Sequence, residues 1–405
     1  MESLSEDKKP SLNGYSYKFL DSVILDKNVD RVKFIKNKNE NFILSACYHL
    51  DKETRKKTGS LNLNKINLNE INLKEDTNSK KILFNTISYE LDYGILDLKY
   101  ANSLNVPINT SGDKESETTT EIKLFTANSD YSISIFSLNF ELTDDAENSP
   151  PFIPLKKYKI HNEEYQYNSK ETCNVLDIKT LDSNCTIILA MNDGCHCVFD
   201  FIKEKPILIK KSHEYGLWSC MIKDKTGNIF FTGSEDSLLK MWDRRTYQKE
   251  ISVNRSHNAS INCIQNFLND DNSNYIVTGS YDESLRIIDV RKFGDCLFQK
   301  KIDCSIWDIN QTNFKSMASL FLMANVYEGF NVFEFDKEKI ISDPNNKEIK
   351  NIFSFPLEKE GILNHTLNHK TIVYGVDSTH LSSDDELYVT SCSFYDNTVS
   401  FWKIF

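Results

Sequence analysis

Aromatic and acidic side chains recur at two fixed places in the second half of the chain. The first place lies five residues after a histidine, or on the matching strand of a further repeat, and is occupied by Trp218, Asn262, Trp307 and Tyr374. The second place lies one residue before a turn aspartate and is occupied by Glu235, Tyr281 and Tyr395. Aromatic faces beside a carboxylate favour an organic cation. If the fold brings these positions together, they form a recognition pocket; the alternative is that the rings pack between repeats.

The histidines and aspartates that set this spacing resemble catalytic residues but are better explained as structural. A buried carboxylate requires hydrogen-bond partners, and a turn aspartate obtains them from the turn backbone and an upstream histidine. We therefore assign structural roles to His213, His257, His369, Asp236, Asp282 and Asp396. No Gly-x-Ser-x-Gly elbow surrounds Ser234 or Ser280. The sequence also lacks a Gly-rich phosphate loop and a dinucleotide fingerprint, so we expect no cofactor.

A repeated unit must position these residues. The plainest copy covers 213–243 and reads as strand, turn, strand, Asp-containing turn and a strand ending in Trp-Asp, and a second copy covers 257–289. An Asp six positions before a large apolar residue marks five repeats, at Asp130, Asp193, Asp236, Asp282 and Asp396. Two further repeats, near Leu63 and Phe333, lack this mark. Seven such units predict an all-β fold, a seven-bladed WD40 β-propeller.

One domain accounts for nearly the whole chain. We expect a disordered tail over 1–14 and a single propeller over 15–405. The gaps between early repeats exceed the usual period of about 40 to 45 residues. Polar surface loops near 64–81, 106–120 and 142–171 explain the excess. The last repeat has only three strands of its own, so an N-terminal strand is expected to pair there and close the ring.

The composition disfavours several classes of partner. Acidic residues outnumber basic ones by 59 to 48, which gives a net charge of -11, and such a field repels phosphate backbones and anionic lipid headgroups. The first ten residues have neither the apolar core nor the cleavage signature of a secretory leader, and we expect no segment that crosses a bilayer, because no stretch stays apolar long enough. We therefore expect a cytoplasmic protein, a monomer, that binds neither nucleic acid nor membrane. The ten cysteines lie singly and without zinc-site spacing, which predicts reduced thiols and no bound metal.

Several segments resemble one family of WD-repeat proteins. The main ones cover 278–283, 374–377 and 390–396, and further similarity occurs over 94–100 and 213–245. This family is that of the WD-repeat diphthine methyl ester hydrolases of the diphthamide biosynthesis pathway. The resemblance extends over most of the chain.

The resemblance implies an activity and a partner. The activity is hydrolysis of the methyl ester of methylated diphthine on translation elongation factor 2, which releases methanol and frees the carboxylate for the final amidation to diphthamide. The partner is then that elongation factor. An aromatic pocket in an acidic propeller suits the trimethylammonium group of this substrate. The alternative is a non-catalytic adaptor that binds a protein partner through the same face, since the fold alone does not imply an activity.

Ester hydrolysis requires a base or nucleophile and donors for the developing oxyanion. Asp377 is the first candidate base, because the equivalent strand positions of two repeats hold Met and Gln, and a carboxylate there must be satisfied or functional. Glu235 is a second candidate base. Ser393 and Cys392, close to Tyr395, are candidate nucleophiles, and Tyr374 or Tyr395 is a candidate oxyanion donor. The alternative for Ser393 and Cys392 is a structural role.

Overall fold

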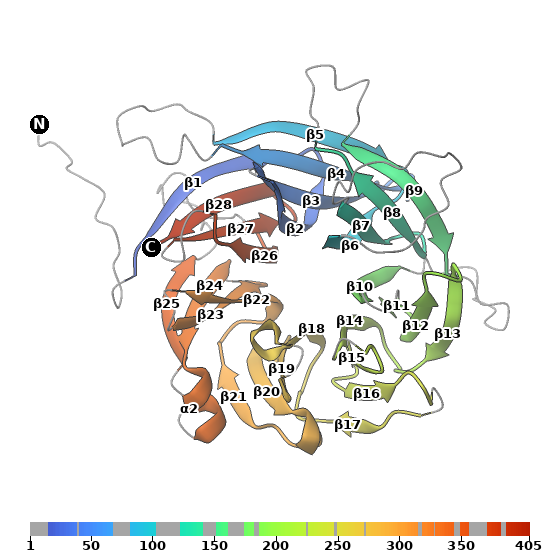
Figure 1. Cartoon of the computed structure of the whole chain (residues 1–405), viewed down its shortest axis with the longest axis vertical. Helices are drawn as coiled ribbons and strands as arrows, with labels where there is room; N and C mark the ends of the chain where they lie inside the picture. The colour runs from blue at the N-terminus through green and yellow to red at the C-terminus, as the bar shows by residue number, and fades with distance from the viewer. Residues whose placement is uncertain are drawn as a thin grey trace, which may run out of the picture.

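The computed structural model of the chain is a closed ring of seven four-stranded antiparallel sheets. Each sheet is one blade that radiates from a central axis, and the blades follow one another around the ring in chain order (Figure 1). The predicted seven-bladed β-propeller is therefore confirmed. The structure describes residues 15–38, 40–67, 82–102, 122–140, 151–160, 174–181, 186–223, 226–246, 249–270, 273–314, 318–327, 329–343, 349–355, 371–381 and 386–405.

Three blades form the first part of the ring. The first contains β2 (Asn28–Asn37), β3 (Glu40–Leu50), β4 (Lys57–Ile66) and β5 (Leu83–Leu91). The second contains β6 (Ile95–Asn102), β7 (Ile122–Asn128), β8 (Ser132–Leu138) and β9 (Phe152–Lys159). The third contains β10 (Val175–Leu181), β11 (Thr186–Met191), β12 (Cys195–Asp200) and β13 (Lys205–Lys211).

Four blades complete the ring. The fourth contains β14 (Leu217–Ile222), β15 (Ile229–Ser234), β16 (Leu239–Asp243) and β17 (Ser252–Asn254). The fifth contains β18 (Ile261–Asn266), β19 (Tyr275–Ser280), β20 (Ser284–Asp289) and β21 (Phe298–Lys301). The sixth contains β22 (Ile306–Phe314), β23 (Ala318–Asn325), β24 (Phe330–Phe335) and β25 (Ile349–Phe355). The seventh contains β26 (Val373–Thr379), β27 (Leu387–Ser393) and β28 (Thr398–Ile404), completed by β1 (Tyr17–Ile24). Short helices are η1 (Phe267–Asn269), η2 (Val290–Lys292) and α2 (Lys337–Ser342).

The ring closes through an N-terminal strand, as the sequence predicts. Strand β1 pairs antiparallel with β28, from Tyr17 opposite Ile404 to Ile24 opposite Thr398. The ring of Phe19 packs edge-on against Trp402, with 5.0 Å between centroids. Both ends of the described chain thus lie in one blade, and the sheet edge that β28 would otherwise expose is paired.

The middle strands of the blades form the core because neighbouring blades cover both of their faces. Every residue of β7, β8 and β27 is buried. Strands covered on both sides do not need the alternation of polar and apolar residues that a half-exposed strand shows. The outermost strand β9, in contrast, mixes buried and exposed side chains.

One predicted loop contains a strand. The sequence predicts a surface loop over 142–171, but residues 152–159 form β9, the outermost strand of the second blade, so the prediction is wrong over these residues. An outermost strand is paired on one side only, and its polar composition does not prevent that pairing. The predicted loop over 64–81 likewise begins too early, because β4 continues to Ile66. Residues 1–14, 68–81 and 106–120 lie outside the described residues.

Histidine and aspartate hold the fourth blade together, as the structural interpretation predicts. The ring of His213 contacts Asp236 through Nδ1 at 2.9 Å and Thr232 Oγ1 through Nε2 at 2.8 Å. Trp242 Nε1 donates to the same Thr232 oxygen at 2.9 Å. Burial lowers the pKa of His213, although the Asp236 carboxylate opposes the shift. These residues are therefore committed to the blade, as buried polar groups usually are.

The fifth blade repeats this arrangement with one change. His257 contacts Asp282 at 3.1 Å and Thr278 at 2.8 Å. Arg286, which is almost fully buried, donates to Asp282 at 2.7 Å. Asp396 lies in the β27–β28 turn of the last blade, and His369 lies outside the described residues.

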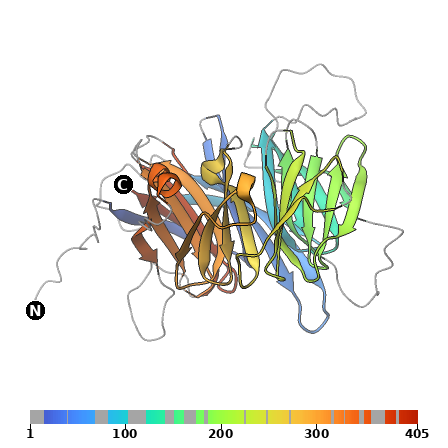
Figure 2. The same ribbon diagram turned by 90° about the horizontal axis from the view of Figure 1, so that it is seen from below.

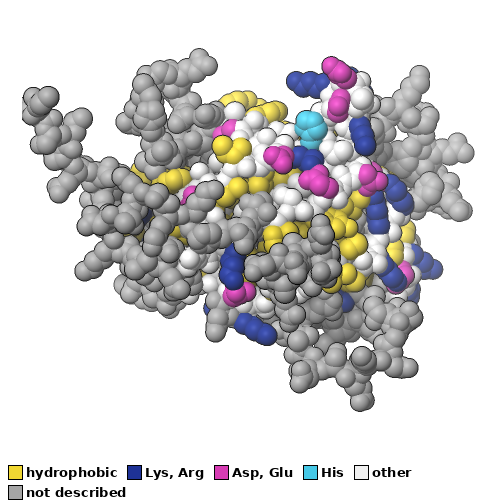
Figure 3. Space-filling view, turned by 90° about the horizontal axis from the view of Figure 1, so that it is seen from above, with side chains coloured by type: hydrophobic (Ala, Val, Ile, Leu, Met, Phe, Trp, Pro, Cys, Tyr) yellow, Lys and Arg dark blue, Asp and Glu magenta, His cyan; other side chains and the backbone are white. Residues whose placement is uncertain are grey.

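Charges of both signs are interspersed on the outer edge of the ring. Figure 3 shows basic and acidic side chains side by side over the part of this edge that is described. Ion pairs between Lys27 and Glu90 and between Lys156 and Glu204 contribute to this pattern.

The eight described cysteines are free thiols and most are buried. Within the described ranges, no helix is long and apolar enough to span a bilayer.

A β-bulge at the same place in all seven inner strands turns one side chain toward the axis. The pairing register between the first and second strand of each blade shifts across a single residue. A bulge places an extra residue opposite one partner and redirects its side chain. The bulged residues are Asp30, Leu96, Leu176, Trp218, Asn262, Trp307 and Tyr374. The propeller therefore gathers seven side chains, distant in sequence, around one opening.

Candidate functional site

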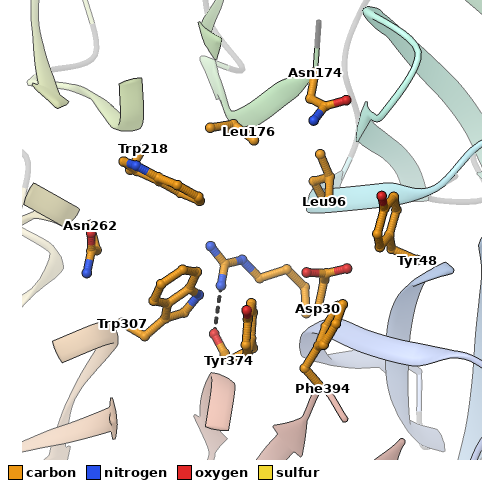
Figure 4. A pocket seen from close by; sticks show the side chains of 11 residues that line it. Asp30, Tyr48, Leu96, Asn174, Leu176, Trp218, Asn262, Trp307, Tyr374 and Phe394 are labelled. Carbon is orange, nitrogen blue, oxygen red and sulfur yellow. Dashed lines mark hydrogen bonds between the residues drawn. The ribbon is translucent and has the colours of Figure 1, made fainter. Parts of the chain in front are cut away.

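A pocket of about 230 Å³ lies at the mouth of the central channel. All seven bulged residues line it, and the lining is completed by Arg31, Tyr48, Asn174 and Phe394 (Figure 4). Its volume is small for a binding site and accommodates the end of one side chain better than a large ligand. The long hairpin between β3 and β4 projects beyond one face of the ring (Figure 2). At its end, Lys57 donates to the pocket residue Asn174 at 2.7 Å, which places this hairpin beside the mouth.

Five aromatic rings form a continuous arc along one side of the pocket. The ring of Trp307 lies 5.4 Å from that of Trp218 and 4.6 Å from that of Tyr374. Tyr374 stacks on Phe394 at 4.7 Å, and Phe394 on Tyr48 at 6.4 Å. Burial raises the pKa of Tyr374, so its hydroxyl remains neutral. Such an arc presents several electron-rich faces to one small volume, the arrangement that binds organic cations.

One carboxylate and two leucines complete the lining across the pocket from Trp218, where Asp30 lies beside Phe394. Asp30 is 6% exposed, and its Oδ2 has no hydrogen-bond partner among the described residues. Burial raises the pKa of Asp30 well above the usual carboxyl range, with the Arg31 charge opposing this shift and Asp97 adding to it. Figure 4 shows the carboxylate of Asp30 on the same side as Leu96, across the pocket from Trp218.

Arg31 is fixed in the wall of the pocket by two partners. Its Nε donates to Asp97 Oδ1 at 3.0 Å, and its Nη1 donates to the carbonyl oxygen of Tyr374 at 2.8 Å, the bond drawn in Figure 4. The carboxylates of Asp308, Asp97 and Asp177 outweigh the cost of burial and raise the pKa of Arg31. A fixed guanidinium therefore supplies a permanent positive charge at the pocket.

Counting from histidines predicts Trp218, Asn262 and Tyr374, and the matching strand of a further repeat adds Trp307. The pocket residues that this spacing does not predict include Asp30, Tyr48 and Phe394. The first blade has no histidine ahead of its inner strand from which to count, because Leu25 lies five residues before Asp30. A signal for Asp30 nevertheless exists in the sequence. Residues 29–33, 95–99 and 175–179 share one pattern, an apolar residue, the bulged residue, a charged residue, an apolar residue and a lysine.

Asp377, the first candidate base, lies in the channel and not in the pocket lining. Its Oδ1 accepts hydrogen bonds from Lys33 Nζ at 3.1 Å and from Asn310 Nδ2 at 2.8 Å. Its Oδ2 accepts from the backbone N–H of Phe34 at 2.9 Å. The carboxylate of Asp377 is thus hydrogen-bonded through both oxygens. This fits a structural role, the alternative to a catalytic one that the sequence leaves open for this residue.

Lysines and aspartates surround the channel beside Asp377. Lys99 pairs with Asp97 at 3.5 Å, and Lys179 pairs with Asp177 at 2.9 Å. Burial lowers the pKa of Lys99 to about 8 and raises the pKa of Asp177 to about 6. The pKa values of Asp97 and Asp177 diverge. Burial opposes ionisation of both, but the charges of Lys99 and Arg31 lower the pKa of Asp97, and the Asp97 charge adds to the rise at Asp177. In the part of the chain that the structure describes, no cluster of three or more His, Cys, Asp or Glu side chains could hold a metal ion.

The three residues predicted from the turn position lie outside the pocket lining. Glu235 is exposed, and its Oε1 accepts a hydrogen bond from Trp218 Nε1 at 2.7 Å, which orients the indole. Tyr281 is 41% exposed, and its hydroxyl contacts that of Tyr327 at 2.6 Å. Tyr395 is 62% exposed and packs edge-on against Phe394 at 4.9 Å. These side chains belong to the surface around the pocket.

Ser393 is buried at the end of β27 and does not line the pocket. Its hydroxyl lies 2.8 Å from that of Thr371 and donates to the Thr371 carbonyl oxygen at 3.3 Å. Ser234 and Ser280 donate to the carbonyl oxygens of Tyr215 and Ala259 in the same way. The same serine-to-carbonyl hydrogen bond therefore occurs in three blades, which fits a structural role for Ser393. Burial also raises the pKa of the neighbouring Cys392 thiol.

Comparison with known proteins identifies the class to which the fold belongs. The family model described as "WD domain, G-beta repeat" matches residues 204–243, 248–289 and 361–403. A chain in a crystal structure of the mitotic checkpoint complex superimposes with a TM-score of 0.59 over 99% of this chain and 96% of that chain, at 11% sequence identity. The protein is a WD40-repeat β-propeller.

Curated relatives support the resemblance found in the sequence. The chain is 26% identical over 240 residues to the diphthine methyltransferase homolog of Dictyostelium discoideum, which covers 53% of this chain and 59% of that protein. It is 24% identical over 237 residues to the diphthine methyltransferase of Schizosaccharomyces pombe, covering 56% and 64% respectively. It is 26% identical over 217 residues to that of Saccharomyces cerevisiae, covering 48% and 50%. The matches thus span between half and 64% of the relatives' length, and the predicted resemblance to the diphthine enzymes is confirmed.

Proposed function

We propose that the protein hydrolyses the methyl ester of methylated diphthine on translation elongation factor 2, which yields diphthine and methanol. The observation that carries this proposal is the pocket at the channel mouth, where an arc of five aromatic rings and a buried carboxylate share one small volume. The similarity to three diphthine methyltransferases supports diphthine as the substrate class. The hydrolytic direction is part of the proposal.

The chemistry of the substrate matches the two sides of the pocket. Methylated diphthine carries a trimethylammonium group on the carbon that also bears the methyl ester. A quaternary ammonium group is attracted by aromatic faces, which Trp218, Trp307 and Tyr374 provide. The ester then lies toward Asp30 and Arg31, the charged residues of the lining. The pocket volume of about 230 Å³ suits such a compact group at the end of a side chain.

The residues predicted from the sequence receive distinct roles in this proposal. Asn262 donates through Nδ2 to the Ile306 carbonyl oxygen at 2.8 Å, so it forms a fixed polar part of the pocket wall. Glu235 orients Trp218, and Asp377 helps to hold Lys33 in the channel. Tyr281 and Tyr395 contact the protein substrate around the pocket. A catalytic role for Ser393 has no support from its contacts.

The decisive experiment uses elongation factor 2 isolated from cells that lack this protein. Incubation with purified protein should remove the mass of one methylene unit from the peptide that carries the modified histidine, as measured by mass spectrometry. Heat-inactivated protein is the control. Retention of the ester after incubation with folded protein would contradict the proposal.

One observation favours a second candidate, a non-catalytic adaptor. Tyr281, Tyr327 and Tyr395 are 41%, 62% and 62% exposed, and exposed tyrosines are common at protein interfaces. An adaptor would bind elongation factor 2 equally well with and without the methyl ester. The enzyme should bind the esterified form and release the product, so equal affinities together with an intact ester would favour the adaptor.

A further inference from the structure

Asp30 differs from the bonded carboxylates of the channel. Asp97, Asp177 and Asp377 each accept hydrogen bonds from neighbouring groups. Asp30 Oδ2 is buried and has no such partner among the residues that the structure describes. Leaving a carboxylate oxygen buried and unbonded is destabilising. A group of this kind that lines a pocket is a candidate for chemistry, because a bound reactant can supply the partner that the fold does not.

Arg31 follows Asp30 in the chain and lines the same pocket. Two bonds, to Asp97 and to the Tyr374 carbonyl oxygen, fix its guanidinium. A donor held in place before the reaction stabilises a developing negative charge without reorganisation. The two adjacent residues therefore present an acceptor for a proton and a donor for an oxyanion at one small site.

We propose that Asp30 is the general base of the hydrolysis and that Arg31 binds the ester carbonyl oxygen. This inference rests on the proposed function. Asp30 takes one proton from a water molecule as the water oxygen forms a bond to the carbonyl carbon, and the negative charge moves to the carbonyl oxygen beside Arg31. The tetrahedral intermediate then expels the methoxy group, which leaves as methanol with the proton from Asp30. The products are the free carboxylate, methanol and one proton released to solvent.

The cation of the substrate prepares Asp30 for this role. Burial holds the pKa of Asp30 high in the free protein, which favours the neutral acid. A trimethylammonium group bound in the aromatic arc adds a positive charge nearby, and this lowers the pKa of the carboxyl group. Binding of the correct substrate thus generates the base. An ester of the same shape without the charge should be cleaved slowly, because it does not favour the ionised form of Asp30.

The test compares Asp30→Asn with the native protein on two substrates. One substrate is esterified elongation factor 2, and the other is the methyl ester of trimethylglycine, which carries the same ester and cation. Asp30→Asn should lower kcat by about 10²- to 10⁴-fold, the usual contribution of a general base, with a smaller change in KM. The analogue in which carbon replaces the cationic nitrogen should be cleaved slowly even by the native protein. Asp26→Asn, an exposed charge change in the same N-terminal region, is the matched control and should be without effect.

The pH profiles give a readout that a purely structural role would not produce. In the native protein kcat/KM should rise with pH as Asp30 of the free enzyme ionises, and kcat should rise at a lower pH because bound substrate favours the carboxylate. In Asp30→Asn, neither kcat/KM nor kcat should show the rise with pH that ionisation of Asp30 causes. If its kcat is unchanged and only KM rises, Asp30 is a counter-charge and not a base. Absence of cleavage by the native protein would instead overturn the proposed function.

Stability supplies an independent test. Because the pKa of Asp30 is raised in the fold, its contribution to stability is present at acid pH and is lost as pH rises through the folded-state value. Asp30→Asn should therefore melt at a higher temperature than the native protein at neutral pH. The difference should close as pH falls to the ordinary carboxyl range. A lower melting temperature for the variant at neutral pH would show that Asp30 serves the fold, and would contradict the inference.

Discussion

The first three blades and the last four contribute different chemistry to one ring of equivalent positions. At the bulged positions the first three supply an acid and two leucines, Asp30, Leu96 and Leu176. The last four supply three aromatic rings and one amide, Trp218, Asn262, Trp307 and Tyr374. A site with two unlike sides is thus built from a single repeated backbone feature.

Part of this division continues along the channel. The residue after the bulge is charged in all of the first three blades (Arg31, Asp97 and Asp177), whereas among the last four it is charged only in the sixth, and the set there is Ser219, Cys263, Asp308 and Gly375. Buried charges require partners. Arg31 of the first blade pairs with Asp97 of the neighbouring second blade, and Asp97 and Asp177 pair with lysines of their own strands. In this ring the paired strands keep the fold intact, and the side chains at the unpaired bulges differ from blade to blade.

The largest effect on the charged part of the channel is expected when Asp97 is replaced. Its side chain is fully buried and bonds to Arg31 at 3.0 Å and to the backbone N–H of Ile178 at 3.2 Å. Asp97→Ala leaves buried cations without their partner, which costs about 3–5 kcal/mol. Urea unfolding should show this loss. Asp289→Asn, which breaks an ion pair with the exposed Arg291, should change the free energy of unfolding little, because exposed ion pairs are screened by solvent. A similarly small loss for Asp97→Ala would contradict the expectation.

The aromatic half is tested at Trp307, the ring between Trp218 and Tyr374. Trp307→Ala interrupts the arc and should raise KM for the cationic ester roughly tenfold to thirtyfold, since a desolvated cation–π contact contributes about 2 kcal/mol. The unfolding midpoint should change little by comparison with Asp97→Ala. Trp307→Phe retains a ring and should recover part of the affinity. An unchanged KM in the Ala variant would place the cation elsewhere.

The smallest effect is expected at the surface around the pocket. Tyr395 is 62% exposed, and most contacts near the edge of an interface contribute less than about 1 kcal/mol. Tyr395→Ala should raise KM for elongation factor 2 about twofold to fivefold and leave cleavage of the small ester unchanged. Ile202→Ala, an exposed apolar residue in the β12–β13 turn, is the control. Equal effects on both substrates would assign Tyr395 to the pocket itself.

Much of the fold is predictable from the sequence because a propeller blade is a local structure. The spacing between Asp236 and Trp242 reflects one turn and one strand, and the same spacing recurs wherever that hairpin recurs. The ring closure by β1 follows from an incomplete last repeat. The sequence predicts a loop where strand β9 forms, because the composition of this segment is polar. An outermost strand has one neighbouring strand and little need for apolar residues.

The site is predictable only in part. Trp218, Asn262, Trp307 and Tyr374 follow from counting along repeats, and the structure brings all four into one pocket. Asp30 lies in a repeat without the histidine that anchors the count. Its importance depends on burial and on a missing hydrogen bond, and both are properties of packed neighbours from other blades.

The sequence by itself determined the number of blades and the residues that hold the fourth and fifth blades together, because these depend on contacts between residues close in the chain. Only the tertiary structure decided which side chains share the axial opening and which of them lack a partner. Those properties arise where seven separate strands meet, and no spacing along one strand records the distance to the others.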